Sequence, residues 1–175
     1  MTKILNILSI FVLMLSCANN NSQNNNQVVD KKQLNDLLIE KNIDMLSLES
    51  QLIDEYIMRN NLDVIKTGTG LRYQILHDGV GEFVKKGDVV TIEYEIRLLN
   101  DEIIYSSEKE GNKTFVVGRG GVESGLEEAV LKLKRFSEAI LILPSHLAYG
   151  IIGDGDKIPH RSVLIYKVKI IDINN

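Results

Sequence analysis

The side chains of this 175-residue sequence do not form any of the common catalytic or metal-binding motifs. Its three histidines, His77, His146 and His160, are scattered without metal-ligand spacing, and a single cysteine, Cys17, excludes an intramolecular disulfide and a cysteine-based zinc site. No Walker loop, dinucleotide-binding glycine motif, nucleophile elbow or His-Glu-x-x-His motif is present. We therefore expect neither a cofactor nor a metal.

The acidic residues and the net charge also argue against several functional classes. Neighbouring carboxylates occur at Glu127-Glu128 and at Asp154 and Asp156, and such pairs usually face solvent rather than act as an acid and a base. Twenty Lys and Arg against 24 Asp and Glu give a net charge of −4. A nucleic-acid-binding protein needs a clustered basic surface, so we expect no nucleic-acid partner.

The remaining candidates for chemistry are aromatic and aliphatic residues that lie close to predicted loops. Tyr149 follows an apolar segment that ends at Pro144, and Ile158 closes a glycine-rich loop that starts at Ile151. A pocket of such residues binds apolar ligands. For Tyr94 and Tyr166 taken alone, packing in the core remains the simpler interpretation. The candidate residues are Tyr94, Tyr105, Phe115, Tyr149, Ile158 and Tyr166.

The elements that must position these residues are mostly short strands. Apolar and polar residues alternate from Ile92 to Leu98, which predicts a half-buried strand, and residues 164–170 alternate in the same way. Shorter strands are expected near 71–75, 103–106, 114–117 and 139–143, and Gly125 opens a helix with Leu126, Ala129, Val130 and Leu133 on one face. The class is α+β, with a curved antiparallel sheet of about five strands wrapped around one short helix.

A helical segment precedes the sheet. Residues 30–61 place apolar residues three to four positions apart, and Asn42-Ile43-Asp44 interrupts the pattern, which predicts two helices. This segment is interpreted either as a spacer that packs on the domain or as an arm for self-association through residues 30–61, and the spacer is favoured.

The first 29 residues have the composition of a targeting signal and a tether. Lys3 precedes an apolar run from Ile4 to Leu15, which is typical of a signal peptide, and Ser16-Cys17 resembles the end of a bacterial lipobox. We expect cleavage before Cys17, lipidation of its thiol and anchoring to a membrane on the periplasmic or cell-surface face. The alternatives are an uncleaved anchor and an ordinary secretory signal with an incidental cysteine. The predicted regions are 1–16 signal peptide, 17–29 Asn-rich flexible tether, 30–66 helical segment and 67–175 sheet domain.

Several segments, in order along residues 68–173, give the sequence a family resemblance. They include Val90-Thr91-Ile92-Glu93-Tyr94, Ile104-Tyr105-Ser106-Ser107, Gly125-Leu126-Glu127-Glu128-Ala129, Pro144-Ser145-His146-Leu147-Ala148-Tyr149-Gly150, Ile158-Pro159 and Ser162-Val163-Leu164-Ile165-Tyr166. Together they resemble the FKBP-type peptidyl-prolyl cis-trans isomerases. The N-terminal features resemble the FKBP lipoproteins that include gliding-motility-associated isomerases.

The resemblance implies a site for proline between the sheet and the helix. It implies that the Tyr149 hydroxyl binds a substrate carbonyl and that the backbone N–H of Glu123 binds another, so that the Glu123 side chain matters less. It assigns catalytic roles to Tyr149, Tyr94, Tyr105 and Ser106, and substrate binding to Phe115, Val122, Glu123, Leu126, Ile158 and Tyr166. The implied partners are proline-containing segments of exported or unfolded proteins.

Four differences distinguish the sequence from the family pattern, and one of them is the loop after Tyr149, which carries Asp154, Asp156 and Lys157 where family members vary widely. Ser106 replaces an acid that many active members carry, Leu126 replaces a tryptophan at the pocket floor, and Phe136 stands where glycine is common. Three hypotheses follow: an active prolyl isomerase, which is favoured, a chaperone or binding module with weak catalysis, and a structural lipoprotein that docks into a surface assembly.

Overall fold

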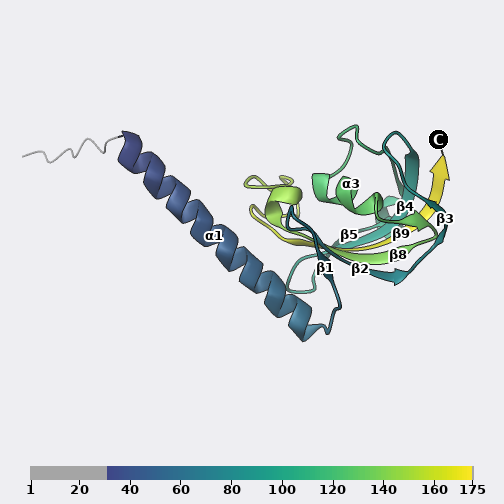
Figure 1. The fold of residues 1–175 in the computed structure, drawn as a ribbon, viewed down its shortest axis with the longest axis horizontal. Coiled ribbons are helices and arrows are strands. Elements are labelled where there is room, and N and C mark those ends of the chain that lie inside the picture. Colours follow the sequence, from purple (N-terminus) through teal and green to yellow (C-terminus); the bar gives the residue numbers. More distant parts are fainter. Residues whose placement is uncertain (1–30, 175) are drawn as a thin grey trace, which may run out of the picture. The chain divides into compact units, whose positions relative to one another are not determined.

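The alternating segments of the sequence pair as one antiparallel sheet in the computed structural model, which describes residues 31–174. The strand order is β1-β2-β8-β9-β4-β5, and β6 pairs with β4 as a seventh strand, while β3 and β7 form a separate pair (Figure 1). The strands are β1 (Ile65–Lys66), β2 (Arg72–His77), β3 (Val80–Phe83), β4 (Val89–Arg97), β5 (Ile103–Ser106), β6 (Lys113–Val116), β7 (Lys134–Arg135), β8 (Glu138–Leu143) and β9 (Leu164–Asn174). The predicted α+β class is confirmed, and the structure adds the two-residue strands and the β3–β7 pair.

The centre of the sheet is the pairing of β4 with β9. Val89 pairs with Asn174 at one end and Arg97 with Ile165 at the other, with one irregularity after Thr91. Along β4 the side chains alternate between one buried face and one solvated face, as the sequence pattern predicts. The buried face of β4 consists of Val90, Ile92, Tyr94 and Ile96.

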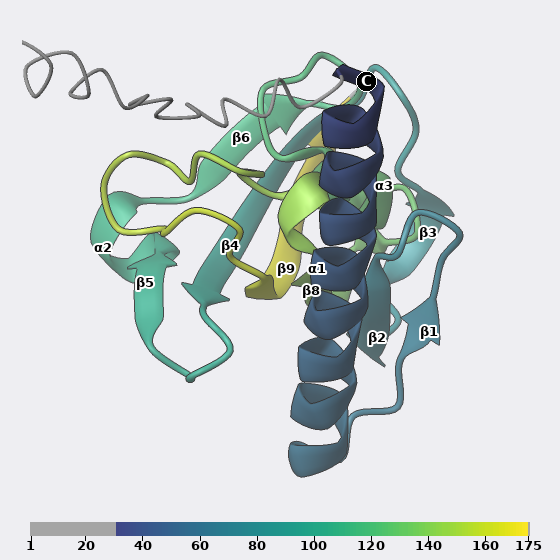
Figure 2. The ribbon, with the colours of Figure 1, turned by 90° about the vertical axis from the view of Figure 1, so that its left-hand side faces the viewer.

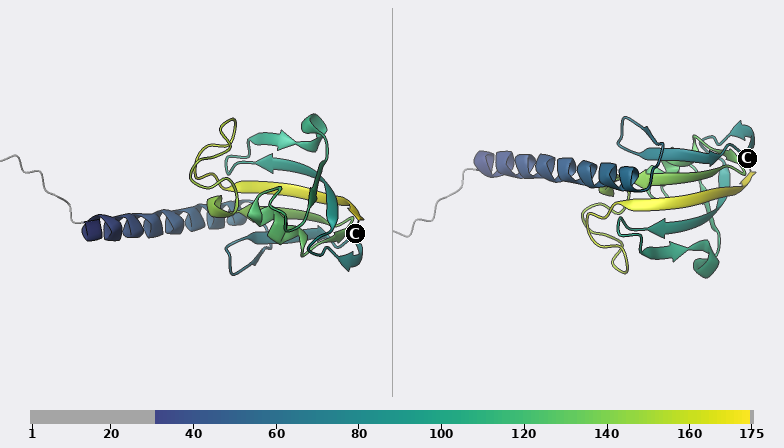
Figure 3. Two further views of the ribbon diagram at one scale, coloured as in Figure 1. Left: turned by 90° about the horizontal axis from the view of Figure 1, so that it is seen from above. Right: turned by 90° about the horizontal axis from the view of Figure 1, so that it is seen from below.

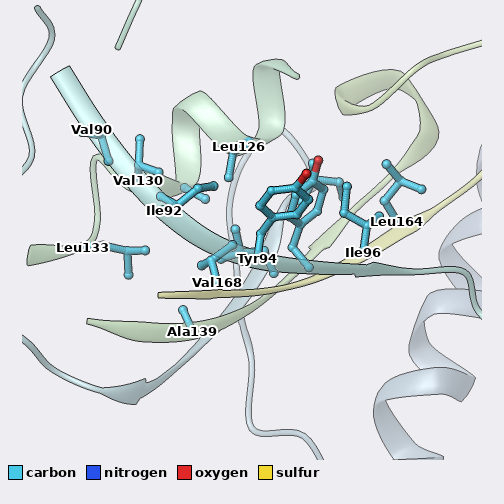
Figure 4. Close-up of a cluster of buried hydrophobic side chains, with 14 of the residues drawn as sticks. Val90, Ile92, Tyr94, Ile96, Leu126, Val130, Leu133, Ala139, Leu164 and Val168 are labelled. Carbon is cyan, nitrogen blue, oxygen red and sulfur yellow. The ribbon is translucent and has the colours of Figure 1, made fainter. Parts of the chain in front are cut away.

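One short helix, α3 (Ser124–Val130), covers the concave face of the sheet (Figure 1, Figure 2). Figure 4 shows Leu126 and Val130 of α3 together with β-strand residues such as Ile92 in one buried cluster. Gly125 allows this close packing, because a Cβ atom there would lie 2.6 Å from Cγ of Leu143 on β8. The predicted helix with its buried face is therefore confirmed.

Two further short helices stand beside the sheet. The helix α2 (Ser107–Glu110) separates β5 from β6, which pair with opposite ends of β4. A 3-10 turn, η1 (Ser145–Leu147), follows β8 and precedes the segment that carries Tyr149. Views along the vertical direction show how the strands fan out around α3 (Figure 3).

Residues Lys31–Arg59 form one helix, α1, without a break, so the predicted division at Asn42-Ile43-Asp44 is wrong. Asparagine and aspartate have only modestly lower helix propensity than alanine, and no glycine or proline occurs in this stretch to interrupt the helix. The chain divides into two units between Ile39 and Glu40.

Within the second unit, the end of α1 packs on the face of the sheet opposite α3. Ile53 and Tyr56 are buried there in a second apolar cluster that includes Ile142 and Ile165 of the central strands. The buried guanidinium of Arg72 donates hydrogen bonds to Asp54 Oδ1 at 3.0 Å and to the Ser50 hydroxyl at 2.9 Å, and the Ser145 N–H donates to Glu49 Oε1 at 3.0 Å. These bonds hold residues 49–59 to the sheet.

The expected signal peptide (1–16), the tether (17–29) and the lipidation site Cys17 lie outside the described residues. Within residues 31–174, no helix combines the length and apolarity that a membrane span requires.

Candidate functional site

A hollow of about 310 Å³ opens where α3 begins, on the α3 side of the sheet. Three of the predicted site residues, Val122, Glu123 and Tyr149, line it. The other lining residues are Lys113, Gly120, Gly121 and Ala148. The hollow thus collects residues from β6, from the loop before α3 and from the segment after η1.

The loop before α3 is held in place by Glu127 from the helix itself. Its Oε1 accepts hydrogen bonds from the backbone N–H groups of Gly118 at 3.1 Å and Gly120 at 2.9 Å. Both glycines have positive φ angles, 81° and 72°, so the loop needs residues without a Cβ atom. Glu127 therefore positions one wall of the hollow, and its role is structural rather than acid–base.

The side chain of Glu123 is buried at the boundary between the hollow and the core, with 8% of its surface exposed. Its Oε1 accepts a hydrogen bond of 2.8 Å from the hydroxyl of Tyr166 on β9. Its Oε2 is also buried and has no hydrogen-bond partner among the described residues. A buried carboxylate oxygen without a donor is costly and uncommon in folded proteins.

The Glu123 carboxylate also contributes to raising the pKa of three tyrosines around it. Burial, followed by hydrogen bonding to the Glu123 carboxylate, raises the pKa of the Tyr149 hydroxyl. Burial and the same carboxylate raise the pKa of Tyr166, and burial with the charges of Glu110 and Glu123 raises the pKa of Tyr94. All three phenols therefore remain protonated at neutral pH and can donate hydrogen bonds.

Most of the other predicted site residues lie beneath the hollow in the main core. Tyr166 and Leu126 are completely buried, and Ile158, Phe115 and Tyr94 retain at most 9% of their exposure. They share one apolar cluster between α3 and the sheet. The structure thus brings these residues together behind Val122, Glu123 and Tyr149 rather than around an open cleft.

Ser106, one of the two remaining predicted residues, precedes α2 and is buried. Its hydroxyl makes no capping hydrogen bond to α2, whereas the next residue, Ser107, accepts a hydrogen bond of 3.1 Å from the backbone N–H of Tyr94.

Tyr105 is tied to the loop that carries Ile158. Its hydroxyl donates to Asp154 Oδ2 at 2.5 Å, and Asp154 Oδ1 accepts from the N–H groups of Asp156 at 2.9 Å and Ile158 at 2.8 Å. The hydrogen bond to Asp154, followed by burial and the negative charges of Asp154 and Asp156, raises the pKa of the Tyr105 hydroxyl. The Asp154 carboxylate therefore links β5 to the loop after Tyr149 through hydrogen bonds.

Two residues of the site were missing from the sequence-based set. Lys113 lines the hollow, with its Nζ atom 5.2 Å from the centre of the Tyr94 ring, in the range of a cation–π contact. Asp154 was interpreted only as a solvated acid. An Asp side chain in a loop often accepts a hydrogen bond from the backbone N–H two residues further on, which forms an Asx-turn. The position of Asp154 in a glycine-rich loop could therefore have predicted this role from the sequence.

Metal chemistry has no visible support in this region. Within residues 31–174, no group of three or more His, Cys, Asp or Glu side chains is arranged to hold a metal ion. The chemistry that the site offers is hydrogen bonding from tyrosine hydroxyls and an N–H group, contact with apolar walls, and one buried negative charge.

Comparison with known proteins gives matches over the sheet domain. The sequence model of the FKBP-type peptidyl-prolyl cis-trans isomerases matches residues 80–171. The chain is 40% identical over 108 residues to the probable FKBP-type peptidyl-prolyl cis-trans isomerase FkpA of Neisseria meningitidis serogroup B, which covers 61% of this chain and 39% of that protein. It is 34% identical over 116 residues to the peptidyl-prolyl cis-trans isomerase Mip of Coxiella burnetii, covering 66% of this chain and 50% of the relative.

A solved structure resembles the fold over a longer stretch. The crystal structure of FkpA from Escherichia coli matches with a TM-score of 0.65 and 25% sequence identity, over 85% of this chain and 69% of that one. The chain spans half or less of the length of the curated relatives FkpA and Mip.

Proposed function

Because the chain belongs to the FKBP-type peptidyl-prolyl cis-trans isomerase family, we propose that it accelerates rotation about X-Pro peptide bonds. The observation that supports this proposal is the hollow at the N-terminal end of α3, which Val122, Glu123 and Tyr149 line together. These are the residues that the family resemblance assigns to binding the prolyl peptide.

The reaction needs no covalent intermediate, metal or cofactor. The barrier to rotation is about 18–20 kcal/mol because resonance gives the C–N bond double-bond character. The twisted amide has less charge separation than the planar one, so surroundings that remove water from the planar amide favour the twisted state. Catalysis then follows from tighter binding of the twisted state than of either planar isomer.

In this chain, the proposed roles divide between donors and walls. The Tyr149 hydroxyl, kept protonated by its raised pKa, donates a hydrogen bond to one substrate carbonyl. The backbone N–H of Glu123, directly before α3, donates to a second carbonyl. Val122 supplies apolar contact at the surface, and Leu126 and Tyr166 support it from the core beneath.

The proposal is tested by an isomerisation assay on X-Pro peptides with wild type and Tyr149→Phe. Loss of the hydroxyl is expected to lower kcat/KM by about tenfold, because a hydrogen bond that strengthens in the transition state is worth roughly 1.4 kcal/mol. Tyr73→Phe is the matched control, since Tyr73 lies on β2 outside the hollow. The absence of any acceleration by wild type at micromolar concentration would refute the proposed activity.

A second function, binding of unfolded chains with weak turnover, is favoured by a specific observation. Leu126 and Tyr166 are completely buried, and the hollow carries the acidic Glu123, so less apolar wall faces a bound prolyl ring. This alternative predicts that the protein suppresses aggregation of an unfolded client without accelerating X-Pro isomerisation. Unchanged aggregation of the client would count against it.

For localisation we propose an envelope lipoprotein of the FKBP subgroup that includes gliding-motility-associated isomerases, acting on exported proteins. The support is the apolar run from Ile4 to Leu15, followed by Ser16-Cys17. A lipidated protein remains with the membrane fraction, and Cys17→Ala would release it. A Cys17→Ala protein that still sediments fully with membranes would refute lipid anchoring.

Self-association through residues 30–61 is proposed as the role of α1 beyond its packed end. Large apolar side chains are exposed along this helix: Leu34, Leu37, Leu38, Ile39, Ile43, Met45, Leu46, Leu48, Leu52 and Met58. Burial of apolar surface contributes about 25 cal/mol per Å², so pairing of two such helices would be favourable. Sedimentation analysis of wild type against Leu38→Lys tests this, and a wild-type monomer at micromolar concentration would contradict it.

A further inference from the structure

The short turn η1, which precedes Tyr149, begins without a capping side chain of its own. The first N–H groups of a helical turn have no partner within the turn, and the residue before η1 is Pro144, whose side chain has no polar atom to accept a hydrogen bond. Ser145, the first residue of η1, is buried with 4% of its surface exposed, so solvent is not available to its N–H. A buried N–H needs an acceptor from the protein.

Glu49 on α1 supplies that acceptor. Its Oε1 atom accepts a hydrogen bond of 3.0 Å from the N–H of Ser145, which lies 96 positions later in the sequence. Both residues belong to the unit that begins at Glu40. The buried guanidinium of Arg72 holds the next turn of α1 in place by donating to Ser50 and Asp54. The packed end of α1 therefore caps η1 from outside.

Ser145 connects this contact to both neighbours of Tyr149. Its carbonyl oxygen accepts hydrogen bonds from the N–H groups of Ala148 at 3.1 Å and Gly150 at 2.8 Å. Tyr149 lies between these two residues, and its side chain lines the hollow. A displacement of Ser145 would therefore move the backbone on both sides of Tyr149, and the hydroxyl with it.

Two other attachments of η1 limit what Glu49 alone contributes. The Nε2 atom of His146 lies 2.9 Å from the carbonyl oxygen of Thr69, and the Ser124 hydroxyl donates to the carbonyl oxygen of Leu147 at 3.4 Å. These contacts hold the middle and the end of η1, whereas Glu49 holds its first N–H. Loss of the Glu49 carboxylate should therefore loosen the turn rather than unfold it.

We propose that Glu49 is a positioning residue that holds Tyr149 in the orientation that the proposed isomerase function requires. The inference rests on that function, because the function assigns the Tyr149 hydroxyl to a substrate carbonyl. Glu49 is not among the residues that line the hollow, and it acts through the backbone of η1. The helix before the sheet domain thus contributes to the geometry of the candidate site.

The first test is an isomerisation assay on an X-Pro peptide with the full chain carrying Glu49→Ala or Glu49→Gln. Alanine removes the acceptor and has the highest helix propensity, so α1 should remain folded. Its kcat/KM should be about fivefold below wild type, a smaller loss than that for Tyr149→Phe, because misplacing a group costs no more than removing it. Glutamine keeps an acceptor oxygen and should retain wild-type activity. Glu55→Ala, at an exposed position of the same helix, is the matched control and should also retain it.

A double-mutant cycle separates positioning from a general loss of stability. If Glu49 acts through the Tyr149 hydroxyl, Glu49→Ala should have little effect on kcat/KM in the Tyr149→Phe background. If it lowers kcat/KM by the same factor in both backgrounds, its effect does not pass through Tyr149 and the inference is wrong. A Glu49→Gln protein that loses as much activity as Glu49→Ala would also overturn it.

Amide hydrogen exchange tests the inference independently of activity. The N–H groups of Ala148 and Gly150 should exchange about tenfold faster in Glu49→Ala than in wild type, while those of β4 and β9 keep their wild-type rates. Unchanged exchange at Ala148 and Gly150, or equally faster exchange throughout β4 and β9, would overturn the inference whatever the catalytic result. If wild type does not accelerate isomerisation, the proposed function is wrong, and the exchange rates alone then decide whether Glu49 holds the segment that carries Tyr149.

Discussion

The hydrogen bond between Tyr105 and Asp154 leads to a prediction about stability, and the size of the effect can be derived from the structure. Asp154 accepts three hydrogen bonds, from the Tyr105 hydroxyl and from the N–H groups of Asp156 and Ile158. A hydrogen bond to a charged group contributes about 1.5–3 kcal/mol when buried, and much less at the surface. Since Asp154 is only half-buried, we expect Asp154→Ala to lower the free energy of unfolding by about 2 kcal/mol.

The assay is thermal unfolding combined with a double-mutant cycle. A loss of about 2 kcal/mol corresponds to a decrease in Tm of roughly 6–10 °C for a domain of this size. Tyr105→Phe should remove one of the three bonds, and its effect should largely disappear in the Asp154→Ala background, with a coupling energy of about 1 kcal/mol. A coupling energy near zero would show that the Tyr105–Asp154 bond does not stabilise the loop.

The stability that the Asp154 hydrogen bonds contribute should depend on pH in one direction. Burial acts to raise the pKa of Asp154, but the hydrogen bonds from Tyr105 and from the backbone of Asp156 and Ile158 outweigh it and hold this pKa below its usual value. A lowered pKa in the folded state gives stability that is present above the unfolded value of about 3.9 and is lost as the pH falls through the folded pKa. The difference in Tm between wild type and Asp154→Asn should therefore be constant from pH 5 to 8 and shrink below about pH 4. A difference that instead persists unchanged at pH 2.5 would contradict the reasoning.

Three other substitutions have definite expectations. Gly79→Ala should cost about 3 kcal/mol of stability by thermal unfolding, because its Cβ would lie 2.1 Å from the Arg135 carbonyl oxygen, and a variant as stable as wild type would contradict this close approach. Arg72→Met should keep the fold but speed amide hydrogen exchange in residues 49–59, because it removes the bond to Asp54, and unchanged exchange would show that apolar packing alone holds α1. Phe136 has a φ angle of 67°, so Phe136→Gly should be at least about 1 kcal/mol more stable than Phe136→Val in chemical unfolding, and equal stability would argue against backbone strain there.

The central strands were predictable from sequence because one face of each is buried. A period of two in β4 and β9 determines which side chains face α3, and the structure confirms this for Ile92, Tyr94 and Val168. The two-residue strands β1 and β7 were not predicted, because two residues show no periodicity.

The helix α1 shows the opposite limitation. Two polar residues around Ile43 suggested a break, but exposed asparagine and aspartate are tolerated inside a long helix that packs at its end through Ile53 and Tyr56. Sequence periodicity locates an apolar face, but it does not distinguish a helix break from a solvent-exposed turn.

Within the site, the backbone pattern was easier to predict than the side-chain environment. The segments carrying Val122 and Tyr149 were expected at the site, and the structure places both at one hollow. The Glu123 side chain was expected to matter little, yet it bonds to Tyr166, which lies 43 positions later in the sequence. Contacts between residues so far apart depend on the register of β9 beside α3, which single-sequence patterns do not specify.

The pairing of β4 with β9 has a consequence for biosynthesis. Residues 89–97 find their main partner only in residues 165–174, and Tyr166 reaches Glu123 from that same late strand. Contacts between such distant segments form slowly, after a large loss of chain entropy. Before β9 pairs with β4, Glu123 therefore lacks the Tyr166 hydroxyl that bonds to it, and the apolar face of β4 is exposed to other proteins. A protein proposed to assist the folding of others therefore completes its own candidate site only after β9, the last strand of its sheet, has paired with β4.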